Sequence, residues 1–137
     1  MYFTLRVRNH PHLMQYFRQD DPISIEAQRQ FIQKDVEHGG YNGRVICIDN
    51  EPVGLCGVKS TGEFTIGVLP EYQKQGISTW VMKELIRTHP GLWSDVFLGN
   101  PALEWFIKLG FKVVGVRERA YYKQDLGLID AITIKHV

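Results

Sequence analysis

The fold of this chain is constrained most by a change of hydrophobic period between Glu63 and Arg87. The stretch Glu63–Val68 alternates apolar side chains with others at every second position, which is the pattern of a β-strand with two different faces. Pro70 ends this strand. From Ile77 onward, apolar residues recur every three or four positions, which predicts an amphipathic helix. The chain must therefore turn from a strand into a helix within a few residues.

The turn between this strand and this helix is polar and contains Gly76. A turn of this kind directs several backbone N–H groups and the positive end of the helix dipole toward one point. That point suits an anion, most obviously a phosphate. The sequence matches neither of the two common phosphate-loop patterns, GxxxxGK[ST] and GxGxxG. On one glycine alone, the pattern is more typical of an ordinary turn than of a phosphate site.

Length and charge restrict the class of protein. With 137 residues, the chain is expected to form one domain over residues 1–137. Lys and Arg number 16 against 15 Asp and Glu, so no bulk charge points to nucleic acid or to an anionic membrane. No apolar run approaches the roughly 18 residues of a membrane-spanning helix, and Arg6 and Arg8 interrupt the region where a signal peptide is apolar. We therefore expect a cytoplasmic protein that binds neither nucleic acid nor membrane.

The cysteines and histidines predict neither a disulfide nor a metal site. Cys47 and Cys56 lie on two adjacent apolar runs joined by a short turn, and a turn centred on Asn50–Glu51 would place them diagonally rather than opposite each other. We expect two buried free thiols. Two cysteines alone cannot build a structural zinc site, and the five histidines are scattered without metal-binding spacing.

The remaining elements predict a layered α/β protein. Strands mixed with helices within one small domain favour a sheet of mixed direction with helices on both sides. Short helices are predicted after Asn9, carrying Leu13, Met14, Tyr16 and Phe17, and after an N-cap at Asp21 or Ser24, with Gly39–Gly40 as the stop of the second; a third helix runs from Asn100 to Gly110. Strands are predicted at Phe3–Val7, Arg44–Asp49, Pro52–Lys59, Trp93–Leu98, Phe111–Tyr122 and Ile129–Val137.

Two motifs then carry a family resemblance. The stretch Val68-x-Pro70-x-x-Gln73-x-x-Gly76-Ile77-Ser78 resembles V-x-P-x-x-[Q/R]-x-x-G-x-[G/A], the acetyl-coenzyme A signature of the GNAT superfamily of N-acetyltransferases. The segment Asn100–Phe111 is similar to a second GNAT motif, N-x-x-A-x-x-[FL]-Y-x-K-x-G-F. Two motifs in this order, separated by one helix and one strand, are more specific than either alone. The resemblance covers the chain from about Val45 onward.

The resemblance implies a fold and an activity. The expected fold is a single GNAT-like domain, with a mixed, mostly antiparallel central sheet of about six or seven strands flanked by about four helices. The expected reaction is direct transfer of the acetyl group of acetyl-CoA to a primary amine of a small molecule, such as an amino sugar, or of a peptide N-terminus, without a metal. The resemblance leaves open whether the protein forms a homodimer. The alternatives are a non-catalytic acyl-CoA-binding or regulatory domain and a domain that serves only protein interactions.

The resemblance also implies the residues that hold coenzyme A. Pantetheine would lie beside the strand Phe64–Val68, and the pyrophosphate would lie on the backbone of Gln73–Ser78. A backbone N–H near Val68 would stabilise the charge that develops on the acetyl oxygen. The candidate coenzyme A residues are Ile66, Val68, Gln73, Lys74, Gln75, Gly76, Ile77, Ser78, Thr79, Asn100, Phe106 and Lys108.

The candidate catalytic residues match the family pattern less closely than the coenzyme A residues do. Glu63 is the candidate base that removes the amine proton, and a solvated glutamate at a strand end is the alternative. Phe106 stands where most members of the family carry the tyrosine that protonates the departing thiolate, and a phenylalanine has no such proton. Three alternatives follow. Coenzyme A leaves as a thiolate or takes a proton from water, or Tyr121 or Tyr122 donates the proton, or catalysis is lost. The two tyrosines alternate in direction, so at most one of them faces a cleft.

Overall fold

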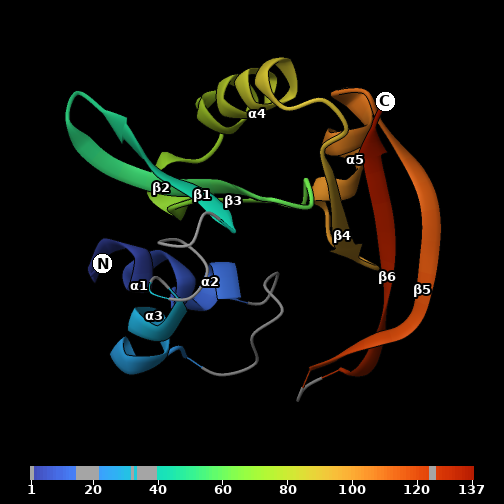
Figure 1. Cartoon of the computed structure of the whole chain (residues 1–137), viewed down its shortest axis with the longest axis horizontal. Coiled ribbons are helices and arrows are strands. Elements are labelled where there is room, and N and C mark those ends of the chain that lie inside the picture. Colours follow the sequence, from blue (N-terminus) through green and yellow to red (C-terminus); the bar gives the residue numbers. More distant parts are fainter. Residues whose placement is uncertain (1, 15–21, 32, 34–39, 124–125) are drawn as a thin grey trace.

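The computed structural model describes residues 2–14, 22–31, 33, 40–123 and 126–137. Three short helices precede two three-stranded sheets, with one long helix between the sheets in chain order (Figure 1). The elements are α1 (Tyr2–Arg8), α2 (Pro11–Met14), α3 (Ile25–Phe31), β1 (Tyr41–Ile48), β2 (Glu51–Lys59), β3 (Phe64–Val68), α4 (Ile77–Thr88), β4 (Trp93–Phe97), α5 (Ala102–Lys108), β5 (Phe111–Lys123) and β6 (Gly127–His136).

The strands form two sheets, which corrects the expectation of one sheet of six or seven strands. One sheet has the order β1-β2-β3 and the other β4-β6-β5, and the pairing within each is antiparallel. The sheets meet where Glu63 forms an isolated parallel bridge with Trp93, whose N–H donates to the Gly62 carbonyl at 3.2 Å. Beyond this point β3 and β4 form no ladder in the described part of the chain. The two sheets are therefore joined at one end and separate beyond it (Figure 1).

The first element is a helix, so the predicted strand Phe3–Val7 is wrong. Val7 is fully buried and packs with Leu13 and Leu69, with Phe3 against the same cluster. Positions 3 and 7 lie one helical turn apart, so both reach this cluster from a single helix face. The alternation of Phe3–Val7 is compatible with either period over so short a segment.

The polar residues between the N-terminal helices include a helix cap at Ser24 that the sequence predicted. The Asn9 side chain, which was predicted to cap α2, accepts from the Ile23 N–H at 2.6 Å and donates to the Ile23 carbonyl at 2.8 Å. Ser24 caps α3, because its hydroxyl accepts from the Ala27 N–H at 3.1 Å. The other positions predicted for these two helices, Tyr16, Phe17, Asp21 and Gly39, lie outside the described residues.

The predicted hairpin of β1 and β2 is present, with its turn at Asp49 and Asn50. Both residues have positive φ, 50° and 66°, as a two-residue hairpin turn of type I′ requires. Cys56 is buried and Cys47 is exposed, and both are free thiols. The prediction of two buried thiols is therefore wrong for Cys47, which follows the buried Ile46 and so points to the opposite face of an edge strand.

The main core joins the two sheets to α4 and α5. The helix α4 covers one face of the sheet β1-β2-β3, and the N-terminal helices lie on the other face (Figure 1). The core residues come from both sheets and both helices: Val58, Phe64, Met82, Leu92, Val96, Phe106, Phe111, Ile132 and Ile134. None of the helices among the described residues is long and apolar enough to span a membrane.

Candidate functional site

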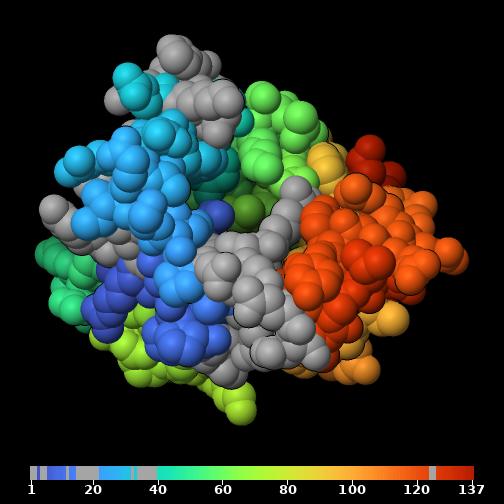
Figure 2. Space-filling model, turned by 90° about the horizontal axis from the view of Figure 1, so that it is seen from below, coloured from blue at the N-terminus to red at the C-terminus, as the bar shows by residue number. Residues whose placement is uncertain are grey.

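A cleft of about 750 Å³ lies where the two sheets separate. Strands β3 and β4 supply its walls, and the turn after β3, the start of α4, the start of α5 and parts of the N-terminal segment complete it. Viewed from below, the N-terminal helices, blue and cyan, lie on one side of the molecule and strands β5 and β6, orange and red, on the other (Figure 2). A volume of this size suits a ligand as large as a cofactor.

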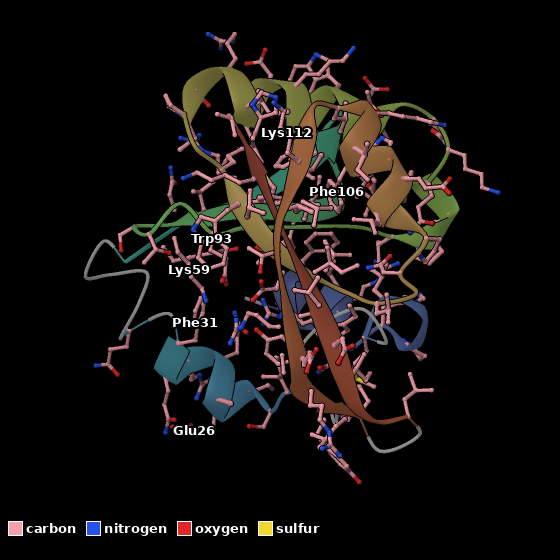
Figure 3. The ribbon with its side chains drawn as sticks, turned by 90° about the vertical axis from the view of Figure 1, so that its right-hand side faces the viewer. Glu26, Phe31, Lys59, Trp93, Phe106 and Lys112 are labelled. Atoms are coloured by element: carbon pink, nitrogen blue, oxygen red, sulfur yellow. The ribbon has the colours of Figure 1, made fainter. Side chains whose placement is uncertain are left out.

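The alternation of β3 divides this cleft into two halves. Phe64, Ile66 and Val68 pack in the cores beneath α4, so their face of the strand borders what we call the α4 half. Glu63 and Thr65 point to the opposite face, toward the N-terminal helices, and border what we call the N-terminal half. Figure 3 shows both halves, because Phe106 lies on the α4 side of the first sheet while Phe31 lies on the other side. The β3 side chains that border the α4 half are therefore apolar, whereas those that border the N-terminal half are polar.

The turn at the open end of β3 is shaped to receive an anion. Lys74 and Gly76 both have left-handed backbones, with φ of 62° and 80°. The first i to i−4 hydrogen bond of α4 runs from the Trp80 N–H to the Gly76 carbonyl at 3.0 Å. Helix geometry therefore leaves the amides of Ile77–Thr79 without an intrahelical acceptor. No described atom lies within 4 Å of where a Cβ on Gly76 would be, so the approach to these amides is open.

The start of α5 packs against the start of α4. The Trp105 indole N–H donates to the Thr79 hydroxyl at 3.0 Å, which joins the two helices beside the cleft. Asn100 accepts the Ala102 N–H on its Oδ1 atom at 2.9 Å and so caps α5. Phe106 has 7% of its surface exposed and its ring lies 5.5 Å from Phe64. It lines the α4 half as part of a rigid aromatic cluster.

Glu63 lies at the point where the two sheets meet. Its side chain is only 9% exposed, and the Lys59 ammonium donates to its Oε1 atom at 3.0 Å. Both residues line the cleft. Glu63 is therefore not the solvated glutamate of the alternative interpretation. Its carboxylate lies beside a cation and is largely buried within the cleft.

Asp95 is a cleft residue that the sequence analysis missed. Its side chain is 1% exposed, and it accepts hydrogen bonds from Thr133 at 2.6 Å, Arg117 at 2.6 Å and Tyr121 at 3.0 Å. Burial raises the pKa of the Asp95 carboxyl, but the hydrogen bonds from Thr133 and Tyr121 and the charge of Arg117 outweigh burial and lower the pKa below its ordinary value. An acidic residue in the interior of a short predicted strand was the available signal.

Most of the predicted site residues meet in this cleft. Those that line it are Glu63, Ile66, Val68, Gln73, Lys74, Gly76, Ile77, Ser78, Thr79, Asn100 and Phe106. Gln75, Lys108, Tyr121 and Tyr122 are not among the described lining residues. Tyr41, Thr65, Asp95 and Trp105 line the cleft and were not predicted. Among the described residues, no three His, Cys, Asp or Glu side chains lie close enough together to hold a metal ion.

Comparison with solved structures shows which fold builds this cleft. The spermidine N-acetyltransferase from Vibrio cholerae, in complex with CoA and spermine, matches with a TM-score of 0.84 and 17% identity over 98% of this chain and 87% of that chain. A phosphinothricin acetyltransferase from Sinorhizobium meliloti, in complex with AcCoA, has a TM-score of 0.79 and 16% identity over 98% of this chain and 81% of that chain.

An acetyltransferase from Salmonella typhimurium that modifies the N-terminal serine of a 50S ribosomal subunit protein has a TM-score of 0.79 and 17% identity, over 99% of this chain and 87% of that chain. At these identities the likeness concerns the fold. No curated protein sequence matches the chain. The sequence model of the acetyltransferase (GNAT) domain matches residues 40–113, more than half of the chain. The chain therefore belongs to the GNAT family and is an acyltransferase.

Proposed function

We propose that this protein transfers the acetyl group of acetyl-CoA to a primary amine by direct attack of the amine on the thioester. The observation that supports this most is the division of one cleft into two halves. The α4 half ends at the open amides of Ile77–Thr79, and the N-terminal half contains Glu63. A phosphate-bearing donor and an amine acceptor would approach each other from these two sides of β3.

The α4 half suits coenzyme A. The amides at the start of α4 and the positive end of the helix dipole would hold the pyrophosphate, and Lys74 would add a positive charge at the exposed edge of the cleft. Pantetheine would lie along Ile66 and Val68. The open space at Gly76 is where a phosphate would need to approach the backbone. Acetyl-CoA supplies an activated acetyl group as a thioester.

Glu63 would act as the base. An alkylamine with a pKa near 10 is mostly protonated at pH 7 and cannot attack until it loses a proton. The Glu63 carboxylate would take this proton directly or through a water molecule and pass it on to solvent. The neutral nitrogen then forms a bond with the acetyl carbon, and the restored carboxylate takes the second proton that the nitrogen loses. A backbone N–H near Val68 would then stabilise the negative charge on the acetyl oxygen.

The C–S bond breaks without an acid from the protein in this proposal. A thiol has a pKa of about 8.5, so the departing thiolate is a weak base at neutral pH and water can supply its proton. The Tyr121 hydroxyl already donates to Asp95 at 3.0 Å, and Tyr122 is 60% exposed. The absence of a hydroxyl at Phe106 is then compatible with catalysis. Tyr121 and Tyr122 stay predictions as acids, to be tested by substitution.

The acceptor would be a primary amine on a small metabolite or at a peptide N-terminus. The similar structures name three different acceptors, namely spermidine, phosphinothricin and an N-terminal serine. Each of these acceptors carries a primary amine. We also propose that the protein works in the cytoplasm with acetyl-CoA and this amine as its partners. The family resemblance also allows a homodimer, and light scattering of the purified protein would measure its mass in solution.

A second candidate function is acyl-CoA binding without catalysis, and Phe106 is the observation that favours it. Thiol release separates the two. Purified protein would be mixed with acetyl-CoA and a panel of spermidine, glucosamine, phosphinothricin and a serine-initiated peptide, and free thiol would be followed. We expect release with at least one amine, and Glu63→Gln should lower this rate by about 10²- to 10⁴-fold, as removal of a general base does, while the Kd for coenzyme A is retained. Coenzyme A binding without thiol release from any amine would leave the binding function instead.

A further inference from the structure

Two hydroxyl groups form a pair in the N-terminal half of the cleft. The Tyr41 hydroxyl and the Thr65 hydroxyl lie 2.8 Å apart, with either oxygen able to donate. Both residues line the cleft. Because each hydroxyl has two lone pairs and one proton, the pair keeps unused acceptor capacity after it forms its own hydrogen bond.

The sheet is built to place the Tyr41 ring at this position. Gly43, Gly57 and Thr65 pair with one another across β1, β2 and β3 and so form one row on the face opposite α4. A Cβ on Gly57 would overlap the Tyr41 ring and hydroxyl, and a Cβ on Gly43 would lie 2.5 Å from the same ring. The two glycines therefore provide a shelf on which the ring lies. Phe31 contacts the Tyr41 ring edge-on, with centroids 5.3 Å apart.

The hydroxyl pair lies on the same face of the chain as the candidate base. Glu63 and Thr65 are two residues apart, so their side chains leave the same side of the backbone about 6.6 Å from each other. All three residues line one cleft, so an acceptor nitrogen between them would lie within reach of the carboxylate and of the hydroxyl pair. Burial raises the pKa of Tyr41 above its ordinary value, so its hydroxyl keeps its proton through the physiological pH range.

We propose that the Tyr41–Thr65 hydroxyl pair orients the acceptor amine for attack. This inference rests on the proposed function. A neutral primary amine has two N–H groups and one lone pair. When one N–H donates to the Glu63 carboxylate and the other to the hydroxyl pair, the lone pair points away from both. It then faces the α4 half, where the thioester would lie. The hydroxyl pair thus selects amines with two N–H groups, which are primary amines.

Two substitutions at Thr65 separate an orienting role from a structural one. Thr65→Val keeps the shape of the side chain and removes the hydroxyl, whereas Thr65→Ser keeps the hydroxyl and removes a methyl group. We expect T65V to lower kcat/KM for the amine about tenfold, as loss of one hydrogen bond in the transition state does, and T65S to stay near the wild type. A structural role predicts the reverse order, because valine fills the same space as threonine.

Substitution of Tyr41 provides a second test of the hydroxyl pair. Tyr41→Phe should lower the same kcat/KM about tenfold, and the double variant Y41F/T65V should lose little more than either single variant, because paired groups act together. Gly57→Ala should also lower it, since its Cβ displaces the ring that carries the hydroxyl. The acceptor probe is whichever of spermidine, phosphinothricin and a serine-initiated peptide releases thiol fastest with the wild type, and calorimetry measures the Kd for coenzyme A in every variant.

The outcomes distinguish this inference from the proposed function. Reduced kcat/KM in T65V and Y41F, with T65S and the Kd for coenzyme A unchanged, supports the orienting pair. Thiol release by the wild type that T65V and Y41F do not change overturns the orienting pair and leaves the acetyl transfer standing. A wild type that binds coenzyme A and releases no thiol with any probe overturns both.

Discussion

The Gln73 side chain donates from its Nε2 atom to the Val68 carbonyl oxygen at 2.9 Å. This hydrogen bond ties the turn before α4 to the last residue of β3, on the side where the strand faces the cleft. We therefore expect Gln73 to act as a positioning residue, because its side-chain amide is bonded to its own strand. The backbone that follows it then holds the left-handed residues Lys74 and Gly76.

Replacement of Gln73 by leucine should weaken coenzyme A binding. The change removes the hydrogen bond to Val68 and leaves the length of the side chain similar. We expect the Kd for coenzyme A to rise about five- to tenfold, as loss of roughly 1 kcal/mol of hydrogen bonding implies, and calorimetry measures it. Gln75→Leu is the matched control, because Gln75 is exposed and donates only a long bond of 3.4 Å to the Glu71 carbonyl. Equal effects of the two changes would contradict a special role for Gln73.

Replacement of Gly76 by alanine should combine backbone strain with loss of coenzyme A binding. A left-handed alanine costs roughly 1–2 kcal/mol, which lowers the free energy of unfolding. The new methyl group would also stand in the open space before the α4 amides. Gly99→Ala is the control, since Gly99 has a φ of 92° and open space around it and is not among the lining residues. We expect similar losses in thermal unfolding but a raised Kd for coenzyme A only in G76A.

Sequence periodicity predicted the central part of the chain because the relevant interactions are local. Each of these elements can be predicted from a pattern of about a dozen residues. They are the strand before Pro70, the turn at Gly76 and the helices on both sides of β4. Both motifs of the family resemblance fall there. Eleven of the predicted site residues consequently meet in one cleft.

The features that were missed depend on contacts between distant segments. The separation of the two sheets follows from the single bridge between Glu63 and Trp93, which no local pattern reveals. The Asp95 network joins β4 to Arg117 and Thr133 on two other strands. The position of the Tyr41 ring over Gly43 and Gly57 likewise depends on how three strands pair. Sequence patterns predict which elements form, whereas these side-chain clusters depend on how the elements pair.

The Asp95 carboxylate should make the stability of the fold depend on pH. Its pKa in the folded protein is lowered from 3.8, so its contribution is present above the unfolded value and is lost as the pH falls through the folded value. We expect Asp95→Asn to lower the free energy of unfolding by roughly 1–3 kcal/mol at pH 7, as loss of hydrogen bonds to a charged group does. Denaturant unfolding at pH 7 and in a series that extends well below pH 3.8 measures the difference.

The difference between Asp95→Asn and the wild type should shrink in the acid series, because the wild-type carboxyl then carries a proton as well. Glu118→Gln is the control, since Glu118 is exposed on β5, and it should leave the free energy of unfolding unchanged at both pH values. A difference for D95N that stays constant from pH 7 to well below pH 3.8 would show that packing, and not the charge, carries the effect.

A tyrosine at position 106 tests how the thiol leaves. A general acid contributes about 10²- to 10⁴-fold to a rate when proton transfer to the leaving group limits it. If water is sufficient, Phe106→Tyr should change kcat by less than about threefold on that scale, with a modest loss of stability because a hydroxyl is added to a packed aromatic cluster. Tyr121→Phe should likewise keep kcat while it loses the hydrogen bond to Asp95. Thiol release with the fastest amine measures both variants. A hundredfold gain in F106Y, or a hundredfold loss in Y121F, would instead show that departure of the thiolate depends on a protein acid, and the size of either change would identify which residue supplies it.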